Sequence, residues 1–369
     1  MNQICTKCIM DDTIADITFD VDGVCNYCKE FNLYLSKDGA KETSISSMDA
    51  LVSRIKSDGR KKKYDCIVGV SGGVDSSWVL YKVKQLGLRP LAVHMDNGWN
   101  SELAQNNIEG LVRALDVDLH THVINWPEYR GLMQAFFDAD VIDVELLYDN
   151  AMLGLNYRLA RKYSIKWILA GTNKSTEGMR MPPNWNWLKY DRRNISAIAR
   201  KSKVSLKTFP AISVLGYVWN QYVARFRWVS FLDFEDYNKE AALLVLEKEC
   251  GYKRYPFKHY ESVFTRFYQA VILPLKFNVD KRKLHLSTLI TSGQMERDEA
   301  LDVMKTPAYP DPNHAQIDKE YFLKKMNWSD QDLEDYLARK PVPHDYYPSE
   351  LGRWKFLRAV FRRGKQFVG

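Results

Sequence analysis

A glycine-rich turn without a lysine is the first feature of the sequence that could do chemistry. It reads SGGVDSS and follows the apolar run YDCIVGV at residues 64–70. Glycine permits backbone with positive φ and lets a phosphate approach the chain closely, and a helix starting there would offer free N–H groups. The turn contains neither the Walker A pattern GxxxxGK[ST] nor the dinucleotide pattern GxGxxG. It therefore predicts a phosphate site built from backbone amides and hydroxyls.

The turn resembles the PP-loop of ATP pyrophosphatases, whose pattern is SGGxDS. The resemblance implies cleavage of ATP between its α- and β-phosphates, with the loop and Mg²⁺ holding the leaving pyrophosphate. Asp75 is expected to help place the Mg²⁺, which would make it a catalytic residue. The residues predicted to bind ATP here are Ser71, Gly72, Gly73, Val74, Asp75, Ser76 and Ser77.

A second polar stretch, GTNKSTEG at residues 171–178, is similar to the GTxNKSE element of NAD synthetases. In that element the threonine approaches ATP and the glutamate helps to bind Mg²⁺, so the similarity predicts a magnesium-binding role for Glu177. The present stretch has one inserted residue before the glutamate. The residues predicted at ATP are Gly171, Thr172 and Asn173, for which a loop with ordinary turn chemistry is the alternative.

Asp96 and Asn97 stand where the PP-loop superfamily recognises adenosine, at the end of an apolar run. The resemblance therefore predicts that both contact the nucleotide. A type I′ turn is the alternative, because Asn-Gly is the commonest signal for that turn.

Four cysteines have the spacing of a metal site. Two C-x2-C pairs, CTKC and CNYC, are separated by sixteen residues. Two such pairs can close a tetrahedral shell of four thiolates around one Zn²⁺, with no position left open for chemistry. The predicted zinc ligands are Cys5, Cys8, Cys25 and Cys28; an iron–sulfur cluster and disulfides are the alternatives. Cys66 and Cys250 have no partner in this pattern, and Cys66 lies in an apolar run that predicts a buried strand.

Strand and helix patterns alternate through the first half of the chain. Strands are predicted at residues 64–70, 89–98, 118–125 and 165–172, with helices at 76–87, 101–115 and 149–164. This alternation is typical of a doubly wound parallel sheet, a Rossmann-like α/β fold in which ligands bind at the carboxyl ends of the strands. The predicted parts are a zinc ribbon (1–35), the PP-loop domain (36–180), a substrate-binding region (181–300) and a mainly helical C-terminal region (301–369).

Residues 249–301 are rich in Lys, Arg, His and Tyr. With the cysteine pairs and HMDNGWNSE, they resemble the N-acetyl sugar amidotransferases, PP-loop enzymes of surface-polysaccharide (O-antigen and LPS) pathways. The resemblance implies conversion of an acetamido sugar, nucleotide- or lipid-linked, into an acetamidino sugar through an adenylylated intermediate and ammonia. Ammonia would come from partners resembling the glutaminase and cyclase subunits of imidazole glycerol phosphate synthase. Nucleic acid is not expected as a ligand.

Charged residues in this half are candidates for phosphate and acceptor binding. Lys258, Lys281 and Arg282 are predicted to clamp phosphates, and His259 or Glu261 to orient the acceptor or ammonia; Lys258, His259 and Glu261 thus join Asp75 as predicted catalytic residues. A solvated basic face is the alternative. Trp185 and Trp187 could stack on a sugar or base, or could share one face of a strand.

The whole chain has 369 residues, 46% of them apolar, and a net charge of +7. The positive charge favours an anionic ligand; the alternative, given equal weight, is that the charge only keeps the protein soluble. No apolar run approaches the about 20 residues of a membrane span, and the first residues lack the pattern of a secretory signal, so a cytoplasmic protein is expected. Residues 353–369 have six basic side chains and no acidic one. They could pack on the protein, dock a partner, or contact an anionic inner-membrane surface.

A tRNA-modifying PP-loop enzyme, either a thiolase or an amidating ligase, is the second hypothesis. The positive charge, the cysteine pairs and the aromatic residues favour it. A thiolase would need a reactive cysteine, for which Cys66 and Cys250 are the candidates. An intact loop gives no support to a third hypothesis, a nucleotide-binding scaffold without activity.

Overall fold

A parallel β-sheet of five strands forms the core of the protein. A computed structural model describes residues 3–36, 47–255, 260–309 and 311–366. The strand order is β3-β2-β1-β4-β5, and every neighbouring pair is parallel. The strands are β1 (Cys66–Gly69), β2 (Pro90–Asp96), β3 (Asp118–Val123), β4 (Trp167–Ala170) and β5 (Arg227–Ser230). The predicted fold class, a doubly wound parallel sheet, is confirmed.

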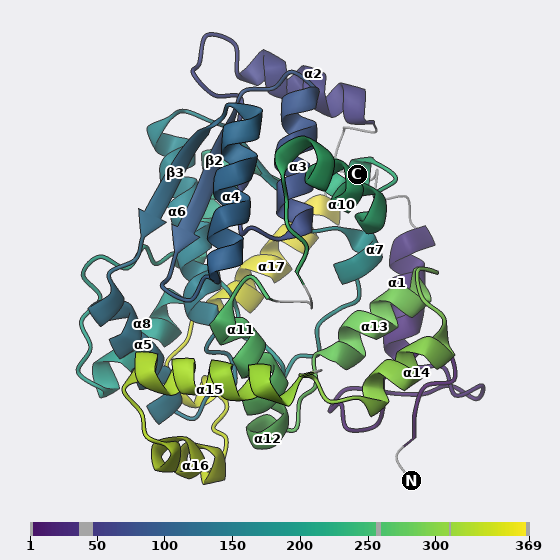
Figure 1. Ribbon diagram of the computed structural model, residues 1–369, viewed down its shortest axis with the longest axis vertical. Helices are drawn as coiled ribbons and strands as arrows, with labels where there is room; N and C mark the ends of the chain where they lie inside the picture. The colour runs from purple at the N-terminus through teal and green to yellow at the C-terminus, as the bar shows by residue number, and fades with distance from the viewer. Residues whose placement is uncertain (1–2, 37–46, 256–259, 310, 367–369) are drawn as a thin grey trace.

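Helices cover both faces of this sheet, which explains why its central strands are apolar along almost their whole length. Ile67 and Ile168 face a core shared with α5 and α6, whereas Cys66 and Val68, which alternate with Ile67, face a core shared with α3, α4 and α10. Figure 1 shows α3 and α4 side by side on one side of the strands. These helices are α3 (Val74–Gln85), α4 (Glu102–Leu115), α5 (Trp126–Asp138), α6 (Leu146–Lys162) and α10 (Lys239–Cys250).

The strand order reverses direction between β1 and β4, because β2 and β3 lie on one side of β1 and β4 and β5 on the other. Ligands of open α/β sheets bind at such a switch point, outside the carboxyl ends of the strands. The SGGVDSS turn follows β1 and the GTNKSTEG stretch follows β4. The topology therefore brings the two predicted ATP-binding stretches to the same place.

The fifth strand was not predicted. Its four residues, RWVS, are too few for a clear period, and they lie at the sheet edge where one is exposed and three are half-buried. Because β5 lies beyond residue 180, the predicted PP-loop segment 36–180 contains four of the five strands. The sheet is completed by a segment that was predicted to bind substrate.

The rest of the described chain is mainly helical, and this includes the C-terminal region that was predicted to be so. Figure 1 shows α13 and α14 beside the N-terminal helix α1, and α15 and α16 together below the sheet. The bounds are α1 (Asn26–Ser36), α2 (Met48–Asp58), α7 (Lys174–Glu177), α8 (Arg192–Lys201), α9 (Val214–Val218), α11 (Val263–Phe267), α12 (Leu273–Phe277), α13 (Arg282–Thr291), α14 (Arg297–Lys305), α15 (Pro312–Met326), α16 (Asp330–Ala338) and α17 (Leu351–Gln366).

The basic C-terminal segment forms most of α17. Its Trp354 ring packs edge-on against Tyr190 at 4.9 Å and against Tyr217 at 6.0 Å, while Phe356, two residues further along the helix, is 68% exposed. One face of this helix thus packs on the protein itself. Among the helices that the structure describes, none has the length and apolar character needed to cross a bilayer.

Candidate functional site

The SGGVDSS turn is a loop whose shape requires glycine. Gly72 has φ of +84°, and a Cβ atom there would lie 2.8 Å from the carbonyl oxygen of Ala104. The hydroxyls of Tyr252 and Tyr255 each donate a hydrogen bond of 2.8 Å to the Gly72 carbonyl oxygen. The loop is therefore fixed from outside by two tyrosines that lie about 180 residues further along the chain.

Serine hydroxyls and free amides line the inside of the same loop. Gly73 is the N-cap of α3 and provides no side-chain cap, so the first N–H groups of the helix stay available to an anion. The Ser71 and Ser76 hydroxyls lie 3.2 Å apart, and the Gly73 amide donates to Ser71 Oγ at 3.3 Å. These groups match the predicted phosphate site. Ser77 instead is buried, and with Gly72 it is absent from the described lining of the cavity that the loop faces.

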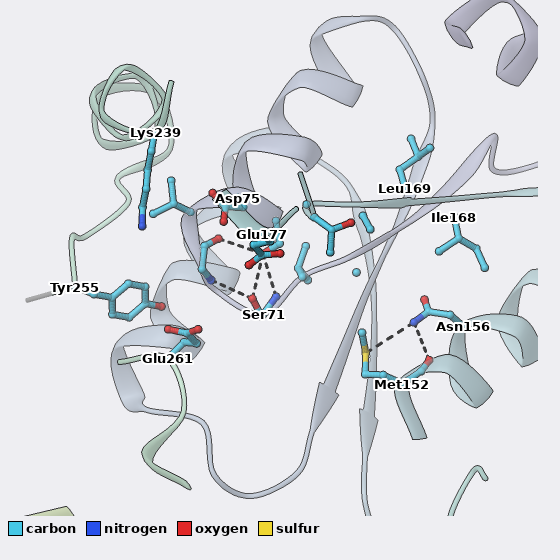
Figure 2. Close-up of a pocket in the computed structure, with 18 of the residues that line it drawn as sticks. Ser71, Asp75, Met152, Asn156, Ile168, Leu169, Glu177, Lys239, Tyr255 and Glu261 are labelled. Carbon is cyan, nitrogen blue, oxygen red and sulfur yellow. Dashed lines mark hydrogen bonds between the residues drawn. The ribbon is translucent and has the colours of Figure 1, made fainter. Parts of the chain in front are cut away.

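The cavity beside this loop, called the loop cavity below, has a volume of about 650 Å³ (Figure 2). Asp75 and Glu177, the two carboxylates predicted to bind Mg²⁺, both line it. Two carboxylate groups lining one cavity are the hard oxygen ligands that Mg²⁺ prefers, so the residues present fit that ion. Asp75 Oδ1 also accepts a hydrogen bond from the Tyr237 hydroxyl. Burial, and next the charge of Asp75, raise the pKa of Tyr237, which keeps this phenol a donor.

The stretch after β4 packs directly on the loop. A Cβ atom at Gly171 would lie 2.9 Å from the Asp75 carbonyl carbon, so only glycine allows this approach. Gly171 and Thr172 line the loop cavity, where Thr172 Oγ1 lies 2.8 Å from Ser230 Oγ. Asn173 is 5% exposed and caps α7 by accepting from the Thr176 amide at 2.9 Å. It thus has the turn chemistry that was its alternative interpretation, whereas its two neighbours reach the cavity.

Asp96 and Asn97 form a turn at the end of β2 that is not the type I′ turn given as the alternative interpretation. Asp96 Oδ1 accepts from the Gly98 amide at 2.8 Å, and Asn97 Oδ1 accepts from the Trp99 amide at 3.1 Å. Gly98 has positive φ and Asn97 does not, which excludes a type I′ turn. Among the described lining residues, neither side chain belongs to the loop cavity; Asn97 lines a neighbouring cavity.

Several residues that line the loop cavity were not among the site residues predicted from the sequence. Tyr148, Trp228, Lys239, Arg254 and Tyr255 line it and come from four separate segments. Figure 2 shows Lys239 extending from α10 toward the side where Tyr255 and Glu261 lie. Arg254 pairs with Glu240 and Glu247 at 2.6 Å each, whereas no carboxylate of the described chain pairs with Lys239. Arg254 and Tyr255 belong to the stretch 249–301 that the sequence marked as rich in Lys, Arg, His and Tyr, whereas no local pattern marked Tyr148, Trp228 or Lys239.

The basic residues predicted to clamp phosphates are not all at the loop. Lys281 Nζ pairs with Glu145 Oε2 at 2.7 Å and lines the neighbouring cavity. Arg282 pairs with Asp280 at 2.7 Å and donates to the Thr306 carbonyl oxygen at 2.8 Å, outside the described lining of both cavities. Glu261 lines both cavities. Lys258 and His259 lie outside the described residues.

The two tryptophans proposed as a stacking surface are occupied by packing. Trp185 is 6% exposed and belongs to the core. Trp187 stacks on His344 with ring centroids 5.2 Å apart, and its Nε1 donates to Asp191 Oδ2 at 2.9 Å. Neither residue lies in a strand. Both interpretations of this pair are therefore wrong, because the loop folds inward onto α8 and the C-terminal region.

The four cysteines of the N-terminal pairs form one buried cluster. Their Sγ atoms all lie within 4.8 Å of one another, and no disulfide joins them. The Cys5–Cys28 and Cys8–Cys25 separations are 4.0 and 3.7 Å. Four thiolates at about 2.3 Å from one ion would lie about 3.8 Å apart, so the residues fit a single tetrahedral metal ion. Backbone amides donate to the sulfurs, as in Cys25 N to Cys5 Sγ at 3.2 Å.

The two remaining cysteines lack the surroundings of a nucleophile. Cys66 is completely buried in β1, and burial raises the pKa of its thiol; Cys250 is 6% exposed, and burial raises its pKa as well. A reactive cysteine needs an exposed, electropositive site that favours the thiolate. The prediction that Cys66 belongs to the core is confirmed.

Comparison with known proteins assigns part of the chain. Residues 261–361 match the family described as LPS biosynthesis protein WbpG-like, C-terminal domain. No curated protein matches the chain. An NH3-dependent NAD synthetase from Campylobacter jejuni aligns with 13% identity over 80% of this chain and 96% of that chain, at a TM-score of 0.31. A U34-tRNA thiolase from Methanococcus maripaludis aligns with 12% identity over 83% and 89%, also at 0.31. TM-scores this low transfer neither a fold nor a function.

The assignment thus rests on the match to residues 261–361 together with the geometry of the loop. That segment contributes Glu261 to the loop cavity and Lys281 to the neighbouring one. The SGGxDS loop stands at the switch point of a parallel sheet, with two carboxylates beside it. These observations support an ATP-using PP-loop enzyme in which residues 261–361 are similar to the C-terminal domain of the WbpG-like LPS biosynthesis proteins.

Proposed function

We propose that the protein is an ATP-dependent amidotransferase that converts an acetamido sugar into an acetamidino sugar. The observation that carries this proposal is the loop cavity, in which a PP-loop, Asp75 and Glu177 meet Glu261 of the WbpG-like domain. The products other than the sugar would be AMP and pyrophosphate. The setting would be the synthesis of a surface polysaccharide such as O-antigen.

The chemistry needs ATP because an amide oxygen is a poor leaving group. The acetamide oxygen would attack the α-phosphorus, and the bond to pyrophosphate would break. The Gly73 amide, the α3 N-terminus and the Ser71 and Ser76 hydroxyls would stabilise the charge that develops on the departing phosphates. Asp75 and Glu177 would hold Mg²⁺, which supplies further neutralisation of that charge when bound.

Ammonia would then add to the activated carbon, and AMP would leave with the former amide oxygen. No cysteine of the described residues is placed as a glutaminase or thiolase nucleophile, because Cys66 and Cys250 are buried with raised pKa values. Ammonia would therefore come from solution or from a partner glutaminase–cyclase pair. The same burial argues against the thiolase hypothesis.

A structural Zn²⁺ is proposed for the four-cysteine cluster. Sulfur separations of 3.7 and 4.0 Å fit one ion better than a cluster of several irons, which would hold the thiolates further apart. Four protein ligands leave no open position on the metal, so it would stabilise the fold.

The test is incubation with ATP, Mg²⁺, ammonium and candidate acetamido sugar nucleotides, followed by mass spectrometry. An acceptor that exchanges one oxygen for NH, with one AMP and one pyrophosphate per product, supports the proposal. ADP as the acceptor-dependent product would reject it. Modification of tRNA under the same conditions would instead support the amidating version of the tRNA hypothesis.

A further inference from the structure

A second cavity of about 330 Å³ adjoins the loop cavity. Ser71, Tyr148 and Glu261 line both, so the two spaces meet at the PP-loop. The remaining walls come from the turn after β2, from the start of α6, from the loop at residues 181–190 and from the segment 261–361 that matches the WbpG-like family. A molecule in the second cavity would therefore reach the phosphates of a nucleotide in the first.

Cations of the second cavity are already neutralised. Lys189 and Lys281 are the basic residues among its described lining. Lys281 pairs with Glu145 at 2.7 Å, and Lys189 pairs with Asp143 at 2.8 Å and with Asp149 at 2.9 Å. Among the described lining residues, a phosphate entering this space would find no lysine without a carboxylate partner. The described wall therefore suits the uncharged part of a sugar better than the phosphate-bearing part of a sugar nucleotide or of a lipid-linked sugar.

Neutral hydrogen-bonding groups make up much of the remaining wall. Asn100 and Asn186 contribute carboxamides, and Ser262 and Thr265 contribute hydroxyls, beside the rings of Tyr148 and Phe264. Such a mixture of polar groups and an apolar surface suits the hydroxyls and the ring face of a carbohydrate. A few well-placed polar groups on a partly apolar wall are the usual composition of a small-molecule site.

Asp149, a carboxylate of the second cavity, shares the lysine that neutralises it with a second aspartate. Asp143 and Asp149 both pair with the single ammonium of Lys189, and Asp143 is almost completely buried, with a side chain 2% exposed, whereas Asp149 is 44% exposed. Asp149 is therefore the member of this pair that an incoming cation can approach.

We propose that the second cavity is the acceptor site: it takes the uncharged ring and acetamido group of the sugar, leaves the phosphate-bearing part outside, and places Asp149 against the amidine that forms. The inference rests on the proposed function. An acetamide is neutral and an acetamidine is a cation, so a carboxylate at this position favours the charge that appears during the reaction. The loop cavity would keep ATP on the opposite side of Ser71.

The test measures calorimetric binding of two phosphate-free monosaccharides, one acetamido and one acetamidino, to the full chain. The acetamidino sugar is expected to bind about tenfold more tightly. Asp149→Asn should remove that preference and leave ATP affinity unchanged, whereas Asp302→Asn, at a side chain of α14 that is 72% exposed, should change neither. Asn186→Ala, which removes a neutral group of this cavity, should weaken both sugars equally.

The outcomes separate the site from the reaction. If amidine forms from the full substrate but Asp149→Asn and Asn186→Ala bind both sugars like the unchanged protein, the acceptor site is wrong and the proposed function stands. If the sugars bind as expected and no amidine ever forms, the site stands and the reaction is wrong. Thermal unfolding of each variant identifies a loss of binding that comes from misfolding, and rescue by Asp149→Glu then decides the role of the carboxylate.

Discussion

Lys239 brings to the loop cavity a lysine side chain, which the SGGVDSS loop itself does not contain. It is the first residue of α10 and lines the loop cavity, while no carboxylate of the described chain pairs with it. Its ammonium can therefore respond to a phosphate without first losing an ion pair. Tertiary structure thus places the lysine of α10 beside the loop, whereas in a Walker A P-loop the lysine is part of the loop sequence itself.

Lys239→Ala is expected to raise KM for ATP about tenfold, because a charge-assisted contact to a phosphate is lost. Steady-state kinetics of pyrophosphate release measure this change. Lys248→Ala is the matched control, since Lys248 lies on the same helix, is exposed and does not line the cavity. Equal KM values for the two variants would place the phosphates elsewhere.

Asp75→Asn should lower kcat about 100-fold while the fold is kept. The asparagine carbonyl can still accept the hydrogen bond from Tyr237, so the change removes the charge that would hold Mg²⁺ and little else. Activity across a Mg²⁺ titration and thermal unfolding measure the two effects. A variant with full activity would remove Asp75 from the catalytic residues.

At the scale of elements, the cysteine cluster and the ATP site are joined by α13. At the end of this helix, Thr291 Oγ1 lies 3.6 Å from Cys28 Sγ and Ser292 Oγ donates to the Ser175 carbonyl oxygen at 2.7 Å. His285 Nδ1 lies 3.2 Å from the Thr176 carbonyl oxygen. Both carbonyls belong to α7, the short helix that ends at Glu177. The cluster thus supports the segment that carries a predicted magnesium ligand.

Removal of the metal, by chelation or by Cys5→Ser, should therefore do more than lower stability. The melting temperature should fall, because metal binding is part of the folding free energy, and hydrogen exchange at residues 174–178 should increase. Cys250→Ser should keep the metal and the exchange pattern. Elemental analysis that finds one zinc per chain tests the identity of the ion. If hydrogen exchange in α7 is the same in the metal-free protein, then metal binding does not stabilise α7 through α13.

At the scale of the whole molecule, His344 joins the C-terminal part of the chain to the segment before α6 and to α8. It is 2% exposed; Nε2 accepts from the Asp143 amide at 3.1 Å, and Nδ1 lies 2.9 Å from Asn194 Oδ1. Because Nε2 must stay unprotonated to accept, the fold selects the neutral ring. Burial lowers the pKa of His344 to about 4.

This shift predicts the acid stability of the protein. In the unfolded chain the ring takes up a proton near its ordinary pKa of about 6.5, so the stability it contributes is present above that pH and is lost as pH falls toward about 4. The loss amounts to about 3 kcal/mol at most. Denaturant unfolding at several pH values should show a flatter dependence for His344→Gln. Parallel curves would contradict the assigned ring state.

The source of the ammonia for the proposed reaction also belongs to the scale of the whole molecule and its partners. Glutamine alone should not support turnover by this chain, whereas ammonium at raised pH should, because only neutral ammonia attacks. A Cys66→Ser, Cys250→Ser double variant should keep the ammonia-dependent activity, since both thiols are buried. Hydrolysis of glutamine by the isolated chain, or loss of activity in the double variant, would overturn the proposal that partner proteins release the ammonia and this chain only uses it.

The sequence alone determined the features that are local in the chain. The SGGVDSS loop, the four-cysteine cluster and four of the five strands follow from short-range patterns, because glycine turns, C-x2-C pairs and buried apolar runs need only neighbouring residues to specify them. The same patterns placed Asp75, Glu177 and Thr172 at one cavity, since strand order in a parallel sheet brings successive carboxyl ends together.

Only the tertiary structure decided which distant side chains complete the site. Tyr237, Lys239 and Tyr255 reach the loop because α10 packs on α3, a contact between residues that no local pattern links. Contacts between other distant segments bury Trp185, stack Trp187 on His344, and give Lys281 a carboxylate partner. Residue type shows what a side chain can bind, but its available partners are set by the elements that fold against it.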